Sequence, residues 1–324
     1  MRDLVPKEVL TSGLYDHPAV RAWNEMTGES GEPEQIQTLK RSKSAVYRLV
    51  GLGPTAGGVI AKRCRAATAE NEFAIYREVL PQLPLESLEC YGMLEDQQAE
   101  YRWIFIEDAG TQPYQRDRQE HRILFAHWLA VLHTASVRIQ AAASLPARGP
   151  EHFLEHLRLG RARIQCNLNN PALVPDDFAW LAALLAQLDF LESRWNQVEE
   201  FCQGMPRTFV HCDTKKKNLR VRQSTTGLSL MAFDWEKAGW GVSGPDVMQC
   251  PDLHQYLCVA TRTWPAMNSN ELERIFNVGV VFRLLAEIHW ETSHLKYQWM
   301  ERPRLSLPLR RQLLAEAIAA IGIN

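Results

Sequence analysis

The residues most suited to chemistry lie in one short loop, residues 211–218, which reads His-Cys-Asp-Thr-Lys-Lys-Lys-Asn. Strand-like residues come before and after it. Such a loop can present Asp213 to a substrate hydroxyl group while Asn218 reaches a metal ion on nucleotide phosphates. A second acid, Asp234, ends an apolar run one short hairpin later, where a carboxylate can hold magnesium. Singly, these residues could cap turns or end a strand, but in this order they favour phosphoryl transfer.

Five segments together resemble a known family. Residues 211–218, residues 233–241 (Phe-Asp-Trp-Glu-Lys-Ala-Gly-Trp-Gly) and the Pro-Asp pair at 245–246 look like the aminoglycoside phosphotransferase and choline kinase-like family. Residues 59–62 resemble the kinase strand that carries a phosphate-binding lysine, and the helix that follows resembles the one carrying its carboxylate partner. The resemblance covers about residues 40 to 250. It implies a kinase-like fold that binds ATP and Mg²⁺.

The resemblance also implies roles for individual residues. Asp213 accepts or orients the proton of the acceptor hydroxyl, and Lys215 steadies the transferring phosphoryl group. Asp246 braces the loop. The implied nucleotide-binding and metal-binding residues are Lys62 with its partner Glu72 (Glu78, on the same helix, is the alternative), Ser44, Glu107 at the hinge, and the magnesium ligands Asn218 and Asp234.

The chain departs from the family pattern at three places. Cys212 stands where the family usually has glycine, which narrows the backbone freedom of that position. Three lysines, 215 to 217, replace a stretch that commonly holds histidine or proline, and we expect Lys216 and Lys217 to face solvent. No GxGxxG precedes the first strand of the hairpin, so backbone N–H groups and Ser42 or Ser44 remain as phosphate contacts.

The expected reaction is transfer of the γ-phosphoryl group of ATP to a hydroxyl group of a small molecule. The sequence leaves the acceptor open among antibiotics, sugars, amino-alcohols and other metabolites, and it leaves the choice of ATP or GTP and the oligomeric state open. The alternative from another class is a nucleotide-binding regulatory pseudokinase without turnover.

A rival motif lies at His152, where residues 152–156 read H-x-x-E-H and could place two imidazoles one helical turn apart on zinc. No third ligand is evident, and the segment also reads as the start of an amphipathic helix. We therefore expect it to be inert. The tryptophan-rich stretches near Trp290 and Trp299 are similarly interpreted as core rather than as a cage for a cationic substrate.

The patterns around these motifs predict an α+β, two-lobed, protein-kinase-like fold. Residues 1–40 read as a lead-in with one short helix near 19–26 and a loose connector. Residues 41–108 predict a small nucleotide-binding lobe with a hairpin (45–50 and 59–64), a helix (68–80) and two further strands. Residues 109–324 predict a larger lobe that is mainly helical, with helices near 119–138, 151–167, 176–203, 271–300 and 306–322.

Composition excludes several other classes. The 324 residues carry 36 Lys and Arg against 38 Asp and Glu, a net charge of -2, which argues against a nucleic-acid partner. No apolar run is long enough for a membrane span, and the mixed-charge N-terminus does not resemble a signal peptide. Seven scattered cysteines without a CxxC pair suit reduced thiols, so we expect a cytoplasmic protein.

Overall fold

The computed structural model describes residues 6–42, 44–54, 58–224 and 227–323. Two compact units are present: the first runs to Leu145 and also includes Asp213–Ala238, and the second comprises Pro146–Cys212 and Gly239–Asn324. Parts of the N-terminal segment (residues 1–5), of the loop before the hairpin (Lys43) and of the hairpin turn (55–57) lie outside the described residues.

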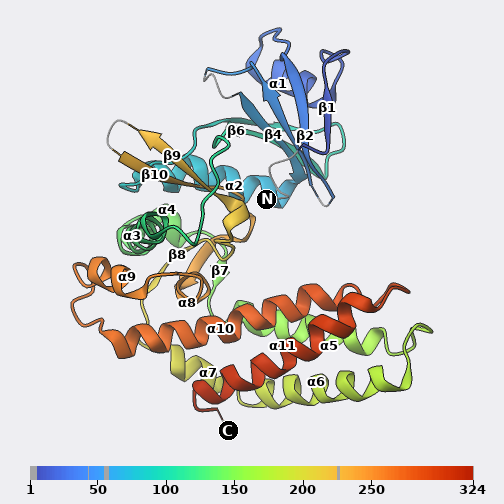
Figure 1. The fold of residues 1–324 in the computed structure, drawn as a ribbon, viewed down its shortest axis with the longest axis vertical. Helices are drawn as coiled ribbons and strands as arrows, with labels where there is room; N and C mark the ends of the chain where they lie inside the picture. The colour runs from blue at the N-terminus through green and yellow to red at the C-terminus, as the bar shows by residue number, and fades with distance from the viewer. Residues whose placement is uncertain (1–5, 43, 55–57, 225–226, 324) are drawn as a thin grey trace. The chain divides into compact units, whose positions relative to one another are not determined.

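A six-stranded sheet forms the framework of the first unit (Figure 1). Its strand order is β1-β2-β3-β4-β6-β5, and every neighbouring pair is antiparallel. The strands are β1 (Glu8–Leu10), β2 (Gln35–Arg41), β3 (Ala45–Val50), β4 (Val59–Arg65), β5 (Cys90–Glu95) and β6 (Tyr101–Glu107). A β-bulge interrupts the pairing of β2 with β3 between Thr38 and Lys40.

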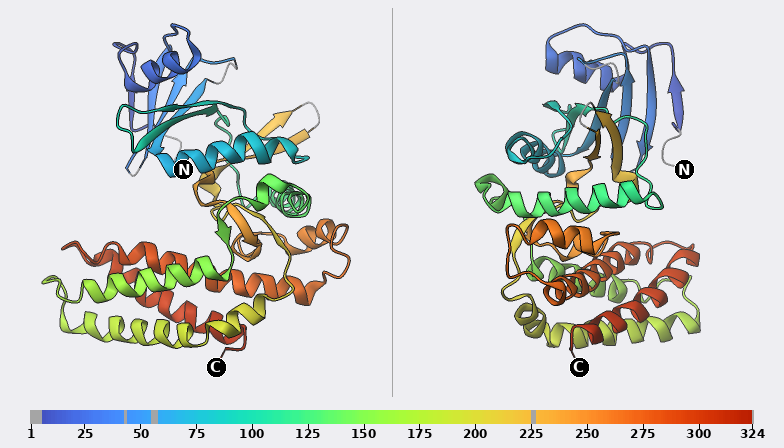
Figure 2. Two further views of the ribbon diagram at one scale, coloured as in Figure 1. Left: turned by 180° about the vertical axis from the view of Figure 1, so that it is seen from behind. Right: turned by 60° about the vertical axis from the view of Figure 1, so that its left-hand side comes forward.

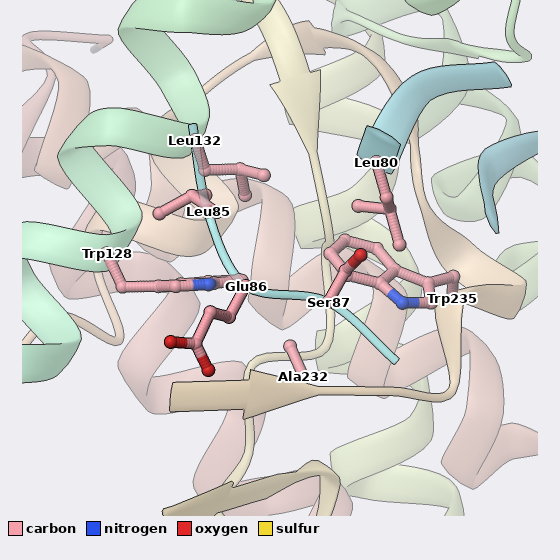
Figure 3. Close-up of a pocket in the computed structure, with 8 residues that line it drawn as sticks. All are labelled: Leu80, Leu85, Glu86, Ser87, Trp128, Leu132, Ala232 and Trp235. Atoms are coloured by element: carbon pink, nitrogen blue, oxygen red, sulfur yellow. The ribbon is translucent and has the colours of Figure 1, made fainter. Parts of the chain in front are cut away.

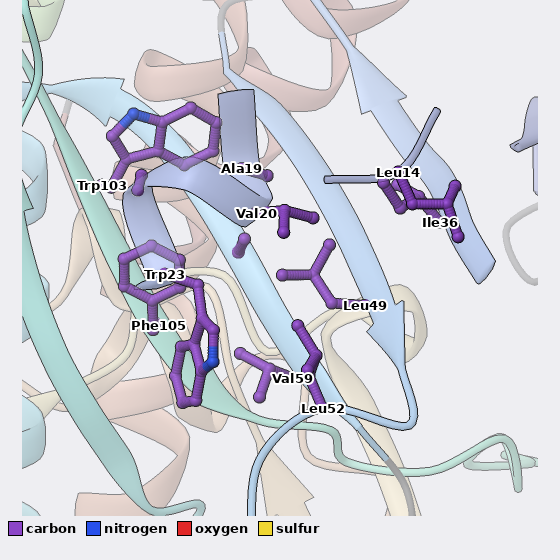
Figure 4. Close-up of a cluster of buried hydrophobic side chains, with 12 residues drawn as sticks. Leu14, Ala19, Val20, Trp23, Ile36, Leu49, Leu52, Val59, Trp103 and Phe105 are labelled. Atoms are coloured by element: carbon purple, nitrogen blue, oxygen red, sulfur yellow. The ribbon is translucent and has the colours of Figure 1, made fainter. Parts of the chain in front are cut away.

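One face of this sheet packs against α1 (Pro18–Thr27) through a buried apolar cluster (Figure 4). Trp23 of the helix meets Phe105 of β6 edge-to-face, with ring centroids 5.5 Å apart. Successive side chains of a strand point to opposite faces. On β4, Val59 and Ala61 therefore join this cluster, whereas the alternate residues Ile60 and Lys62 face the other side. The core thus fixes which side chains of β4 are available for a site.

The first unit also contains helices, short helical turns and a β-hairpin. Helix α2 (Ala66–Ala74) follows β4 directly and continues as a π-helical turn η1 (Ile75–Val79) and a 3-10 turn η2 (Leu80–Gln82). After β6 come α3 (Gln119–Ser136) and α4 (Gln140–Ala143). The segment from Asp213 contributes the 3-10 turn η3 (Lys216–Asn218), the hairpin β9 (Leu219–Ser224) and β10 (Gly227–Ala232), and the 3-10 turn η4 (Trp235–Lys237).

The second unit is mainly helical, and Figure 2 shows its long helices lying alongside one another. Helix α10 (Ser269–Thr292) packs against both α5 (Pro150–Cys166) and α11 (Glu301–Ala320), and α6 (Pro175–Ser193) contacts α5 and α11. The unit also holds α7 (Trp195–Cys202), α8 (Gly244–Val247), α9 (Leu253–Ala260) and a small sheet of β7 (Ala147–Arg148), β11 (Gly239–Val242) and β8 (Arg207–Val210).

Most elements lie where the sequence predicts them, but the loose connector before residue 40 is wrong. Residues 35–41 form β2, an interior strand of the sheet, and β1 pairs with it. Only Ile36 and Thr38 of this strand are buried. The polar residues beside them obscure the alternation of apolar and polar residues by which a strand is recognised in a sequence. No helix in the described part of the chain has both the length and the apolar character that a membrane span requires.

Candidate functional site

A cavity of about 400 Å³ lies against the face of the sheet opposite α1. All of its lining residues belong to the first unit. Its apolar side chains come from the sheet and the segments next to it: Leu39, Val46, Ile60, Leu88, Ile106 and Phe233. Its volume falls in the range of small-molecule sites, and an apolar wall of this kind suits a flat aromatic base.

Lys62 joins two carboxylates in this cavity. Its Nζ pairs with Glu72 of α2 and lies 2.7 Å from Oδ1 of Asp234. Burial by itself lowers the pKa of Lys62, but the carboxylates of Glu72 and Asp234 outweigh that effect and raise the pKa well above its ordinary value. Lys62 is therefore an ammonium ion at any ordinary pH. Of the two alternatives on the helix, Glu72 makes this pair.

The two carboxylates respond differently to their surroundings. Burial raises the pKa of Glu72 to about 7, against the opposing attraction of Lys62. Burial also opposes ionisation of Asp234, yet Lys62 and, more weakly, Lys40 and Lys217 lower the pKa of that carboxyl to about 2. Of these two carboxylates, Asp234 therefore favours its charged form more strongly.

Asp234 is held by the residue that follows it. Trp235 is almost completely buried, packs against Trp128 of α3 and lines a void of only about 10 Å³ with side chains that include Leu80 and Leu132 (Figure 3). A void of that size holds at most one water molecule. Asp234 itself has φ 66°, a left-handed conformation that Asp tolerates better than most residues. The anchored indole keeps the carboxylate turned toward Lys62.

The loop of residues 213–218 brings Asp213 and Asn218 together. The side-chain amide of Asn218 donates to the carbonyl oxygen of Asp213 at 2.9 Å and to its Oδ2 at 3.4 Å. The backbone N–H of Asn218 donates to the carbonyl oxygen of Lys215. The carbonyl oxygen of Asn218 accepts from the backbone N–H of Phe233, the residue before Asp234. Asn218 therefore links the loop to the strand end that carries Asp234, and it lines the cavity.

Two lysines lie beside Asp213. Nζ of Lys237 donates to Oδ2 at 3.1 Å, whereas Nζ of Lys215 lies 3.7 Å from Oδ1 and its side chain is 43% exposed. Lys237 has no assigned role in the sequence interpretation. The sequence shows that Lys237 follows Asp234 by three residues. It does not show the pairing of Lys237 with Asp213, 24 residues earlier, because that contact depends on the fold of the β9–β10 hairpin.

The residues present suit a magnesium ion. Carboxylate oxygens of Glu72, Asp234 and Glu236 lie within 4.8 Å of one another, and Mg²⁺ prefers hard oxygen ligands. The amide oxygen of Asn218 adds a neutral donor, because its nitrogen is the atom directed at Asp213. Glu72 and Asp234 both pair with Lys62, but the pKa of Glu72 is raised by burial whereas that of Asp234 is lowered. Asp234, Asn218 and Glu236 are therefore the better candidates. Glu236 is an acid that the sequence interpretation did not assign.

Glu107 and Asp108 both line the cavity, and each is held by an arginine. Arg222 lies 2.9 Å from Oε1 of Glu107 and also donates to the carbonyl oxygen of Asp108. Arg48 pairs with the carboxylate of Asp108 at 2.7 Å. The side chain of Glu107 is therefore engaged, and its backbone N–H donates to the carbonyl oxygen of Glu89 at 2.8 Å.

Ser44, Asp213 and Lys215 are not among the described residues that line the cavity. Ser44 follows the turn after β2, and its buried Oγ has no hydrogen-bond partner among the described residues. Lys216 and Lys217 are both exposed, and of the two Lys217 also lines the cavity.

In the second unit, the fully buried carboxylate of Asp246 supports the residues that precede Asp213 in the chain. It accepts hydrogen bonds from the backbone N–H groups of His211 (2.7 Å) and Cys212 (2.8 Å), which confirms its expected bracing role. Cys212 has φ 59°, the conformation that favours glycine. A glycine would adopt this backbone conformation without steric strain, whereas the Cβ of Cys212 is strained in it.

The rival histidine motif also lies in the second unit. Nε2 of His152 is 3.2 Å from Nε2 of His156, and Nδ1 of His156 is 2.6 Å from Nδ1 of His289. Because His156 uses a different ring nitrogen toward each neighbour, one metal ion could not bind all three rings at those atoms. Hydrogen bonds between the rings account for this row without a metal.

Comparison with known proteins agrees with this geometry. The family model described as the phosphotransferase enzyme family matches residues 39–255. No curated protein sequence is detectably similar to the chain.

Solved structures show the same fold at low sequence identity. Spectinomycin phosphotransferase, crystallised with ADP and spectinomycin, is 11% identical with a TM-score of 0.54, covering 90% of this chain and 93% of its own. A choline kinase from Cryptosporidium parvum Iowa II is 13% identical with a TM-score of 0.59, covering 89% and 92%. A putative aminoglycoside phosphotransferase from Ralstonia eutropha JMP134 is 12% identical with a TM-score of 0.60, covering 94% and 97%.

These matches confirm the expected α+β, kinase-like fold. Because the family model spans about two thirds of the residues, including Lys62, the 213–218 loop and Asp234, the chain belongs to the phosphotransferase enzyme family.

Proposed function

We propose that this protein transfers the γ-phosphoryl group of ATP, bound with Mg²⁺, to a hydroxyl group of a small molecule. The observation that carries the proposal is the arrangement in one cavity of Lys62, its two carboxylate partners and Asn218, with Asp213 held by that asparagine. Phosphoryl transfer requires mainly alignment and charge neutralisation, and these groups supply both.

Each residue has a role in the proposed reaction. Asp213 orients the acceptor hydroxyl and takes its proton as the acceptor oxygen bonds to the γ-phosphorus and the bond to the β–γ bridging oxygen breaks. The products are ADP and the phosphate ester, and the proton passes to solvent. A bound Mg²⁺ would neutralise charge on the phosphates. Asp234 and Asn218 would hold the metal ion, while Lys62, oriented by Glu72, would contact the α- and β-phosphates.

Three assignments depend on the family pattern more than on contacts. We assign Lys215 to the transferring phosphoryl group, because its Nζ lies 3.7 Å from Oδ1 of Asp213, beside the proposed base. Ser44 is assigned to the phosphates through its unpartnered Oγ. The backbone of Glu107 is assigned to the base.

The cysteines of the described chain are free thiols, which supports a reducing compartment such as the cytoplasm.

The test is a magnesium-dependent screen of ADP release from purified protein against alcohols, sugars, amino-alcohols and antibiotics. The relatives named above include enzymes for spectinomycin and choline, so both belong on the panel. The proposal predicts acceptor-dependent ADP release with at least one class. Thermal stabilisation by nucleotide without ADP release for any acceptor would instead support the regulatory pseudokinase.

A further inference from the structure

The cavity is lined by lysines that have no role in the reaction proposed above. Each acidic residue among the lining side chains already has a cation: Glu72 and Asp234 have Lys62, Asp108 has Arg48, and Glu107 has Arg222. Three lysines that also line the cavity, Lys7, Lys40 and Lys217, have no salt bridge within the described part of the chain. The cavity therefore offers uncompensated positive charge to an anion.

The register of the sheet places Lys40 near Lys62. Lys40 pairs with Val46, and Val46 pairs with Lys62, so the three residues occupy one rung across β2, β3 and β4. Directly paired residues point to the same face, and adjacent strands are about 4.8 Å apart, so Lys40 lies roughly 10 Å from Lys62 along the wall.

The β-bulge explains how Lys40 reaches that face. Leu39 and Lys40 are consecutive, and both line the cavity, which a regular strand does not permit. The pairing shifts between Thr38 and Lys40, and bulges of this kind redirect side chains beside binding sites. The backbone of β2 is thus shaped to turn Lys40 toward the cavity.

Lys217 lines the cavity from a different element, η3. It immediately precedes Asn218, which also lines the cavity. Both Lys40 and Lys217 lower the pKa of Asp234, so their charges act at the end of the cavity where that carboxylate lies. Lys216 and Lys217 are both exposed, but Lys216, one residue earlier on the same turn, is not among the lining residues.

We propose that Lys40 and Lys217 bind the polyphosphate of the nucleotide from two different elements that line the cavity, in place of the glycine-rich loop that this chain lacks. The inference rests on the function proposed above. The turn between β2 and β3, residues 42–44, reads Ser-Lys-Ser and contains no glycine for a close backbone approach. Two ammonium groups provide by charge what backbone N–H groups provide elsewhere.

The experiment compares the affinities of adenosine, AMP, ADP and ATP for the whole chain and for Lys40→Gln, Lys217→Gln and Lys216→Gln, by calorimetry at two salt concentrations. Lys40→Gln and Lys217→Gln should each weaken ATP and ADP roughly tenfold, leave adenosine unchanged and reduce the salt dependence of binding. Lys216→Gln, which removes a charge from the same turn, should have little effect. Lys217→Arg should restore most of the affinity.

Two results would overturn the inference alone. One is a loss for Lys40→Gln and Lys217→Gln no larger than that for Lys216→Gln; the other is an equal loss for adenosine and ATP, which would indicate a general change in the cavity. If the unchanged chain binds neither ATP nor GTP, the proposed function fails and this inference with it.

Discussion

Lys237 donates a hydrogen bond to Oδ2 of Asp213 at 3.1 Å, and the carboxylate it contacts is only 3% exposed. The amide of Asn218 approaches the same oxygen at 3.4 Å. Two donors on one oxygen fix the orientation of the carboxyl group. Lys237 is thus a positioning residue for the proposed base.

Replacing Lys237 by Met should lower kcat by roughly tenfold to a hundredfold, because the base loses its orientation, while nucleotide affinity stays unchanged. Lys237→Arg should restore part of the rate. A fall in nucleotide affinity as large as the fall in kcat, or an equal loss in Lys237→Arg, would show that the pair serves only structure.

Substitution of Asp234 should act on metal-dependent binding. Asp234→Asn is the appropriate variant, because Asn also tolerates the left-handed conformation at φ 66° whereas Ala would add strain. The gain in ATP affinity on adding Mg²⁺ should fall by about tenfold or more, since a charged ligand becomes neutral. Affinity is measured with magnesium and with EDTA. An unchanged magnesium gain would mean that Asp234 only ends its strand.

Cys212→Gly should relieve backbone strain at φ 59°. The matched control is Cys212→Ala, which also removes the sulfur but keeps the Cβ that is strained in this conformation. The glycine variant should be more stable than the alanine variant by about 1 kcal/mol, because the left-handed penalty for a Cβ exceeds the entropic cost of glycine. Denaturant unfolding of both variants measures this, and an alanine variant of equal or greater stability would contradict it.

The row of histidines should make stability depend on pH. Burial, with Arg148 and His289 adding to it, lowers the pKa of His152 to about 4. In the unfolded chain the imidazole titrates near its ordinary value, so the unfolded state binds more protons between pH 4 and pH 6.5. The stabilising contribution is therefore present above about pH 6.5 and is lost as the pH falls toward 4.

The measurement is the free energy of unfolding of the whole chain and of His152→Gln at pH 7.5 and pH 5. The wild-type chain should lose on the order of 1 kcal/mol more than the variant on acidification, because only about 1.5 pH units of the shift lie above pH 5 and the figure is discounted for partial exposure. His156 and His289 remain in both proteins, so the difference isolates His152. Parallel losses in the two proteins would be evidence that this imidazole titrates normally.

The sequence predicted the elements that have strong local patterns. The β-branched residues of β3 and β4 and the helical period after Ala66 were readable because packing and propensity agree there. β2 was missed because its residues are mostly polar and a bulge breaks the alternation that reveals a strand. No local signal separates such a strand from a connector.

The candidate site shows the same division. Lys62, Glu72, Asn218 and Asp234 could be named from spacing, because each follows a recognisable motif, and the structure brings them together. Three consecutive lysines carry no such information. Which of them faces the cavity depends on the 3-10 turn at Lys216–Asn218, and the contact of Lys237 with Asp213 depends on the whole hairpin between them.

The most direct test of the account is the formation of phosphorylated acceptor by the wild-type chain and by Asp213→Asn. With an acceptor identified in the screen, phosphorus NMR follows the ester, and calorimetry measures MgATP affinity for both proteins. The account predicts that Asp213→Asn binds MgATP as the wild-type chain does but forms the ester at least about 100-fold more slowly, the scale expected for loss of a positioned proton acceptor. Ester formation by Asp213→Asn at a rate near that of the wild-type chain would contradict it.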